Sequence, residues 1–177
     1  LRRAASSGRP RAVVRRLAAA PYPEAMSDSP AASTSSSEAP RHRFDDGGQA
    51  LSIAPLVRRF LPHLIEFRRD LHSHPELSYR EHRTTDRLMT ELEAVGLEPV
   101  RLRSTGCYVD IGTGELSVAL RADIDALPIQ EATGLEFSSQ NPGVAHMCGH
   151  DIHTTVMLGV ATVLADLNRT SPLSGRV

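Results

Sequence analysis

The chain has 177 residues with 20 basic and 21 acidic side chains, and every basic residue is Arg. This balance argues against a protein that binds nucleic acid through bulk positive charge. The sequence has no run of ~18–20 apolar residues, the length of a membrane span. Two cysteines are too few for a disulfide scaffold, and they favour a reducing, cytoplasmic location.

The beginning of the chain differs in composition from the rest. Residues 1–47 hold 8 Arg and 5 acidic residues, whereas residues 48–177 hold 12 and 16. Ala, Ser, Pro, Arg and Gly dominate the first part, which has too little apolar surface to offset the entropy cost of ordering. We therefore predict a disordered leader over residues 1–50 and a folded domain over residues 51–177. The Arg-rich start is either an organellar transit peptide or sequence upstream of a start at Met26.

Two amphipathic helices are predicted after the leader. Apolar residues recur at helical spacing over residues 52–72. His74-Pro75 should end this helix, because the residue before Pro avoids the α region. A second helix over residues 80–95 should stop at Gly96 and bury one face, formed by Thr84, Leu88, Leu92 and Val95.

Strands and a third helix should follow. Three short strands are predicted over residues 99–103, 108–111 and 117–121, the last two joined by a hairpin link at residues 112–115. The third helix, over residues 152–167, should turn its apolar side chains inward: Ile152, Val156, Val160, Val163, Leu164 and Leu167. This order of elements predicts an α/β fold.

Polar residues gather at three places where a core does not require them. These clusters are residues 68–76 at the end of the first helix, residues 121–128 at the end of a strand, and residues 146–153 before the third helix. The third cluster reads His-Met-Cys-Gly-His-Asp-Ile-His. Cys148 and His150 can point at one cation, and thiolate and imidazole suit zinc and its neighbours in the transition series.

Other interpretations of the third cluster stay open. Cys148 would instead be a nucleophile if His150 activated it near a helix N-terminus, or the loop would hold its Cys and His residues incidentally. Asp151 would either orient an imidazole or cap the third helix.

The other two clusters also have a structural alternative. In the second, two Asp residues at a spacing of two face the same side of an extended segment. One of them would steer an imidazole, or Arg121 would simply pair with an Asp. In the first, His72 and Glu76 would be surface neighbours or part of a solvated helix end. Cys107 lies outside all three clusters and is expected to be a small buried residue.

The three clusters lie in segments that resemble a known superfamily. The segments are FRRDLHSHPELSYREHRTTDRL, VALRADIDALPIQE and GVAHMCGHDIHTTVMLGVA. In this order they resemble the metal-dependent amidohydrolases of the aminoacylase and carboxypeptidase G superfamily. The nearest branch contains hippurate hydrolase, auxin-conjugate hydrolases and bacterial N-acyl-amino-acid amidohydrolases. The resemblance covers about residues 55–177.

For the fold, the resemblance implies the N-terminal part of a zinc-exopeptidase-like catalytic domain with a mixed sheet between helices. The lid domain, through which relatives of this kind form homodimers, would be absent. A further strand should start near Arg176-Val177, and the remaining metal ligands and the general-base Glu should follow it. The chain is therefore expected to be truncated and inactive alone.

For the site, the resemblance implies that Cys148 and His150 are ligands of two divalent metal ions, zinc or manganese. Asp125 matches a supporting Asp of the superfamily. The reaction implied is metal-assisted hydrolysis of the amide bond in a small N-acyl amino acid, such as a hippurate-like or auxin-conjugate-like substrate. The alternatives are a non-catalytic metal-binding or interaction remnant and a thiol hydrolase that depends on Cys148.

Overall fold

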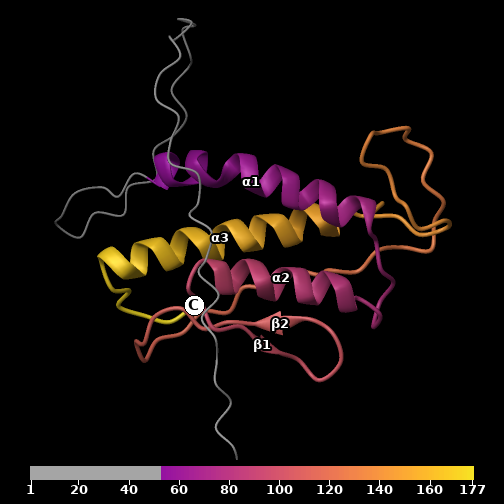
Figure 1. The fold of residues 1–177 in the computed structure, drawn as a ribbon. Coiled ribbons are helices and arrows are strands. Elements are labelled where there is room, and N and C mark those ends of the chain that lie inside the picture. Colours follow the sequence, from indigo (N-terminus) through magenta and orange to yellow (C-terminus); the bar gives the residue numbers. More distant parts are fainter. Residues whose placement is uncertain (1–52) are drawn as a thin grey trace, which may run out of the picture. The chain divides into compact units, whose positions relative to one another are not determined.

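The computed structural model describes residues 53–177, so the predicted leader lies outside the described residues. Three helices and two short strands follow one another in the order α1 (Ile53–Ser73), α2 (His82–Ala94), β1 (Val100–Arg101), β2 (Cys107–Tyr108) and α3 (His150–Thr170). Figure 1 shows the helices on one side of the strands. This arrangement confirms the predicted α/β class.

Local signals set the helix ends where they were predicted. Helix α1 ends one residue before His74-Pro75. Helix α2 ends in a Schellman motif, in which the Gly96 N–H donates to Glu93 O at 2.9 Å and the Leu97 N–H to Leu92 O at 3.1 Å. Gly96 has φ +82°, a left-handed conformation that costs glycine little. The sequence therefore located both helix ends correctly.

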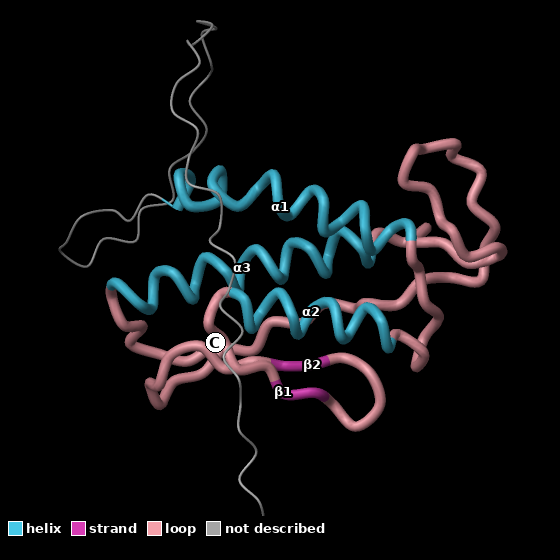
Figure 2. The backbone as a smooth tube through the Cα atoms, in the orientation of Figure 1, coloured by secondary structure: helices cyan, strands magenta, loops and turns pink. Residues whose placement is uncertain are grey.

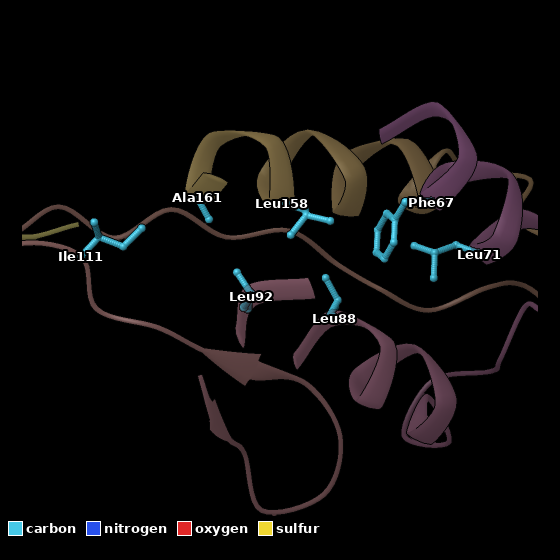
Figure 3. Close-up of a cluster of buried hydrophobic side chains, with 7 residues drawn as sticks. All are labelled: Phe67, Leu71, Leu88, Leu92, Ile111, Leu158 and Ala161. Carbon is cyan, nitrogen blue, oxygen red and sulfur yellow. The ribbon is translucent and has the colours of Figure 1, made fainter. Parts of the chain in front are cut away.

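The core lies where the three helices meet the segment after β2. Figure 3 shows its buried side chains, which come from α1, α2, α3 and that segment: Phe67, Leu71, Leu88, Leu92, Ile111, Leu158 and Ala161. Truncating one of the buried leucines to Ala is expected to cost about 2–5 kcal/mol. The predicted inner face of α2 is confirmed, because Thr84, Leu88, Leu92 and Val95 are all buried.

The buried face of α3 differs in part from the prediction. In α3, Ile152 and Val156 are exposed, and the buried positions include Thr154, Thr155 and Thr162. These threonine hydroxyls donate to carbonyls four residues earlier, which satisfies them within the helix. The Thr154 hydroxyl also lies 3.1 Å from the main-chain oxygen of Asp123. In α1 an apolar stripe is 42–51% exposed, formed by Ile53, Val57, Leu61 and Ile65.

Helices α1 and α3 approach each other closely at Gly159. A Cβ added to Gly159 of α3 would lie 3.0 Å from a methyl group of Leu64 in α1. A side chain at position 159 would therefore push the two helices apart, so glycine allows their close approach. The predicted inner face of α3 is thus wrong at Ile152 and Val156 but confirmed at Val163, which is buried, and at Leu164, which packs against the core.

The predicted hairpin between residues 108–111 and 117–121 is wrong. Instead, β1 pairs with β2 in antiparallel register, Val100 with Tyr108 and Arg101 with Cys107. Residues 117–121 form only one isolated bridge, from Ser117 to Arg176, and Figure 2 shows this segment as a loop.

The last two residues lie between the segments that the hairpin would have joined. Ile111 and Val177 exchange two backbone hydrogen bonds, at 2.8 and 2.9 Å. On the other side, the Arg176 N–H donates to Leu116 O at 2.8 Å and the Val118 N–H to Arg176 O at 2.9 Å. The first pairing is antiparallel and the second parallel, so the strand pairing is mixed, as expected.

Two glycines make room for this insertion. A Cβ on Gly112 would lie 2.3 Å from the carbonyl oxygen of Gly175, and one on Gly114 would lie 2.1 Å from that of Ser174. The glycines that suggested a tight hairpin turn therefore allow a distant segment to approach. Within residues 53–177, no helix has the length and apolar character needed to cross a membrane.

Candidate active site

Backbone pairing brings the three polar clusters together. The Ala126 N–H donates to Glu76 O at 2.7 Å, which joins the second cluster to the first. Leu127 and Ala145 exchange two hydrogen bonds of 3.0 Å, which place the second cluster beside the start of the third. Helix α3 begins five residues after Ala145, at His150.

His150 is fixed by a carboxylate of the second cluster. Its Nδ1 lies 2.9 Å from Asp125 Oδ1 and 3.0 Å from the main-chain oxygen of Asp125. Both partners are acceptors, so Nδ1 carries the proton and Nε2 is left without a hydrogen-bond partner among residues 53–177. The Ser78 hydroxyl donates to the other carboxylate oxygen of Asp125. The imidazole is thereby held in one orientation with one nitrogen free.

The charge of Asp125 suits this contact. Burial by itself would raise the pKa of this carboxyl, but hydrogen bonds from Ser78 and His150 outweigh burial and lower the pKa. Asp125 is therefore an anion near neutral pH and an acceptor for the imidazole. Asp123, two residues earlier, is paired with Arg121 at the surface. The alternative prediction, that Arg121 pairs with an Asp of this cluster, is therefore also confirmed.

Cys148 offers a second donor next to His150. It is a free, exposed thiol, separated from His150 by Gly149, whose φ of +83° turns the chain into α3. Within residues 53–177, no group of three or more His, Cys, Asp and Glu side chains is placed to hold a metal ion. The donor set fits a metal chemically, since it combines a free thiol with an imidazole anchored through its other nitrogen, but it is incomplete in this part of the chain.

A second polar network is buried beneath the site. His72 is 4% exposed; its Nδ1 lies 2.8 Å from Asp151 Oδ2 and its Nε2 3.2 Å from Glu131 Oε1. Arg68 Nε also lies 2.7 Å from Asp151 Oδ2. Both interpretations of His72 as a surface residue are therefore wrong. Asp151 orients an imidazole, but it is that of His72 in the first cluster, and no cap on α3 is formed.

Glu131 is the residue of this network that the sequence did not reveal. Burial would raise its pKa, but hydrogen bonds from the Thr133 hydroxyl, the Ser139 N–H and His72 lower the pKa to about 2. It lies in the long loop before the third cluster, and its spacing to other polar residues carries no periodic signal. Only the folded loop brings it to His72.

Glu76 has a structural role instead of contacting His72. Its carboxylate accepts the backbone N–H groups of Arg83, at 3.1 Å, and Thr84, at 2.8 Å. Helix α2 has no side-chain cap from its own N-cap residue. An acceptor from the preceding loop therefore satisfies the free N–H groups and the positive end of the helix dipole.

Three further His and Cys side chains differ in their surroundings: His146, His153 and Cys107. His146 is buried with no hydrogen bond to either ring nitrogen, and burial lowers its pKa, so its ring is neutral. His153 is exposed, with its ring centroid 5.9 Å from that of His150. Cys107 packs against the core, and burial raises the pKa of its thiol. The prediction that Cys107 is a small buried residue is confirmed in part, because the residue packs against the core but is only partly buried.

This α/β fold and the side chains at its candidate site can be compared with those of known proteins. Residues 119–177, which include Asp125, Cys148 and His150, match the sequence model of Peptidase family M20/M25/M40. A Geobacillus stearothermophilus protein named N-acyl-L-amino acid amidohydrolase is 44% identical over 119 residues, which are 65% of this chain and 32% of that protein. These matches confirm the resemblance seen in the sequence.

A solved structure agrees with this assignment. A Bacillus subtilis protein described as a dinuclear metal binding peptidase of the M20 family has a TM-score of 0.62 and 43% identity, over 68% of this chain and 34% of that one. The fold of this chain therefore matches part of such a protein, and the chain spans about a third of the length of these two relatives.

One further relative carries a different name. A Rhodococcus jostii protein named putative glutamate–cysteine ligase 2-3 is 57% identical over 104 residues, which are 57% of this chain but only 13% of that protein. A match to so small a part of a protein does not bear on the ligase activity in its name.

Proposed function

We propose that this chain is part of a metallohydrolase that cleaves the amide bond of N-acyl amino acids, with Cys148 and His150 among the ligands of two divalent metal ions. The observation that carries the proposal is the pairing of His150 Nδ1 with Asp125 next to a free thiol. Support for the reaction comes from the relative named N-acyl-L-amino acid amidohydrolase. Support for two ions comes from the relative described as dinuclear.

Asp125 acts in this proposal as a positioning residue. By accepting a hydrogen bond from the Nδ1–H it fixes the tautomer in which Nε2 has a free lone pair, and its negative charge makes that nitrogen a better donor to a metal. Ser78 holds the second carboxylate oxygen, so the Asp cannot rotate away from the ring. When bound, the ions would polarise the substrate carbonyl and lower the pKa of a bound water.

The proposal extends to the metal, the location and the assembly. A thiolate ligand favours zinc over manganese, because zinc is the softer ion. Both cysteines are free thiols, which fits a cytoplasmic location. A homodimer through a lid domain remains a proposal taken from the family resemblance.

A thiol hydrolase is the competing proposal for Cys148. It would need the thiol within hydrogen-bond reach of a base, and among residues 53–177 no hydrogen bond joins Cys148 to His150. A metal-binding remnant without catalysis would use the same two ligands. Chelation separates the thiol hydrolase from the metal proposals, since a thiol enzyme keeps its activity when metal is removed.

The metal site can be tested on the purified chain with Co²⁺ as the probe. A cobalt–thiolate bond produces a charge-transfer absorption band, which we expect for the unaltered chain and for Cys107→Ser. We expect the band to be lost in Cys148→Ser and weakened in His150→Ala. A band that survives Cys148→Ser would exclude this Cys as a ligand.

The reaction itself needs a longer protein that contains this chain. We expect it to release the amino acid from hippurate or another N-acyl amino acid, to lose this activity on chelation, and to regain it with Zn²⁺ or Mn²⁺. Metal binding by Cys148 without hydrolysis of any N-acyl amino acid would support the non-catalytic remnant instead.

A further inference from the structure

His72 lies where three separate parts of the chain meet. Its ring comes from the last turn of α1 and is buried. Asp151, in the first turn of α3, contacts one ring nitrogen, and Glu131, in the long loop before the third cluster, contacts the other. The two carboxylate side chains are only 1% and 2% exposed. Bulk water therefore satisfies none of these three groups.

The contacts of His72 decide how many protons its ring carries. Nδ1 lies 2.8 Å from Asp151 Oδ2, and Nε2 lies 3.2 Å from Glu131 Oε1. An ionised carboxylate only accepts hydrogen bonds, whereas a neutral imidazole donates from one nitrogen and has a lone pair on the other. In either neutral tautomer, one lone pair would therefore face a carboxylate oxygen. Only a ring with a proton on each nitrogen makes both contacts favourable.

Arg68 does not remove the need for the second proton. Its Nη2 lies 3.3 Å from His72 Nδ1 and could donate to a lone pair there. That lone pair would, however, also point at Asp151 Oδ2, which lies closer to Nδ1. Arg68 Nε lies 2.7 Å from the same carboxylate oxygen. The arrangement is satisfied when Arg68 and His72 both donate to Asp151.

The charges of this buried cluster also require a protonated His72. Burial would raise the pKa of Glu131, but its hydrogen bonds lower the pKa to about 2, so it is an anion at neutral pH. With a neutral His72, the guanidinium of Arg68 alone would face two buried carboxylates. Buried charges without a partner are strongly disfavoured. The nearby ring of His146, 6.4 Å from that of His72, is neutral and cannot supply the missing charge.

Glu131 connects His72 to the long loop. Its carboxylate accepts the Ser139 N–H at 2.6 Å and the Thr133 hydroxyl, which closes the loop around this side chain. From the same loop, the ring of Phe137 lies edge-on to His72, with 5.5 Å between the two centroids. The loop is therefore attached to the end of α1 through His72.

Backbone contacts hold the loop over the same end of α1. The Gln140 N–H donates to Ser73 O at 2.9 Å, and the side-chain amide of Asn141 donates to Pro75 O at 2.7 Å. These bonds fix the position of the loop backbone, but they leave the buried carboxylate of Glu131 without a cation. The loss of His72 should therefore loosen the loop without detaching it completely.

Asp151 connects His72 to the candidate site from the other side. It directly follows His150 at the beginning of α3. Cys148 and His150 therefore lie on a stretch of chain that is tied to His72 before it, through Glu131, and after it, through Asp151. A shift of either carboxylate relative to α1 would change the separation of the thiol and the imidazole.

We propose that His72 carries a proton on each ring nitrogen and is a positioning residue of the candidate metal site. One N–H donates to Asp151 and the other to Glu131, so a single buried cation holds both sides of the stretch that carries Cys148 and His150. The positioning role rests on the proposed function. The protonation of the ring does not, because it follows from the contacts alone.

The first experiment measures the protonation of His72 by ¹⁵N NMR of the unaltered full chain at neutral pH. A chelator is present, so the result is independent of metal binding. After assignment of the backbone, we expect each ring nitrogen of His72 to show coupling to a directly bonded proton. A ring with one unprotonated nitrogen would overturn the proposal.

The second experiment compares the affinity for Co²⁺ of the unaltered chain and His72→Gln. A Gln amide has one donor group and one acceptor oxygen, so it cannot donate to both carboxylates. We expect the affinity to fall about tenfold, while the cobalt–thiolate band remains because Cys148 is still present. Leu92→Ala is the control, since it truncates a core side chain of α2 outside the network and should leave the affinity of the folded chain unchanged.

Glu131→Gln provides a second variant in case His72→Gln does not fold. It removes one of the two contacts, so the affinity should fall by a smaller factor. An unchanged affinity in a folded variant of either kind would overturn the positioning role and leave the proposed function intact. An equal loss in Leu92→Ala would also overturn it, since general destabilisation would then explain the effect. A missing cobalt band in the unaltered chain would instead contradict the proposed function, and the positioning role with it.

Discussion

Asp125 and Asp151 each bind an imidazole, but from different clusters. Asp125 contacts His150, whereas Asp151 lies next to His150 in sequence and contacts His72 instead. In a helix, adjacent side chains point in different directions. At the start of α3, the Asp151 carboxylate therefore points away from the neighbouring His150 ring and towards His72. The nearest carboxylate in sequence was therefore not the partner in the fold.

Replacement of Asp125 tests its positioning role. Asp125→Asn keeps the size of the side chain but removes its charge, so we expect metal affinity to fall about 10–100-fold. Titration with Co²⁺ measures the affinity, and the unfolding curve should change little. Asp123→Asn is the matched control, because Asp123 pairs with Arg121 at the surface and should leave the affinity unchanged. Equal losses in both variants would contradict the assignment.

Glu131 predicts a specific dependence of stability on pH. Its pKa is about 2 in the folded chain, against an ordinary value of 4.5, so the unfolded state binds more protons between these values. Its stabilisation is therefore fully present above about pH 4.5 and is lost as the pH falls through about 2.

The Glu131→Gln variant should lose on the order of 2 kcal/mol in the free energy of unfolding at neutral pH. The difference from the unaltered chain should shrink as the pH approaches 2. Urea unfolding across this pH range measures it, with the exposed Glu136→Gln as the control. A difference that stays constant with pH would mean that the charge of Glu131 contributes nothing.

At the level of elements, helices were predictable and strand partners were not. The ends of α1 and α2 follow from local signals, His74-Pro75 and Gly96, which act within one turn of the chain. The partner of Ile111 is Val177, and no local pattern indicates so distant a pairing. The glycines at 112 and 114 are compatible with a turn as well as with a close approach, so the sequence alone could not distinguish the two.

The close approach at Gly114 can be tested directly. Gly114→Ala would place a Cβ 2.1 Å from the carbonyl oxygen of Ser174, so residues 174–177 must move. We expect faster hydrogen exchange at the amides of Val118 and Arg176 and a lower Tm. Gly134→Ala is the control, since nothing lies within 4 Å of its added Cβ. It should strain only its own backbone, where φ is +69°, and leave those amides protected.

At the scale of the whole molecule, the described residues hold an incomplete set of metal donors. Within residues 53–177, no three His, Cys, Asp or Glu side chains form a metal site, whereas a catalytic metal site usually has three protein ligands. We therefore expect the 177-residue chain to release no measurable amino acid from hippurate, even when loaded with Zn²⁺ or Mn²⁺. Release above a metal-only control, measured by amino-acid analysis, would contradict this expectation.

By itself, the sequence determined the helices, the α/β class, the three polar clusters and the family resemblance. Helices and clusters depend on residue types at short spacing, and the class and the resemblance depend on the order of such segments along the chain. All of these can be read without knowing which distant residues meet. The tertiary structure decided which carboxylate holds His150, that His72 and Glu131 are buried partners, and where Arg176 and Val177 pair. These contacts join residues far apart in sequence, and the close packing of α1 on α3 and the route of the long loop select them.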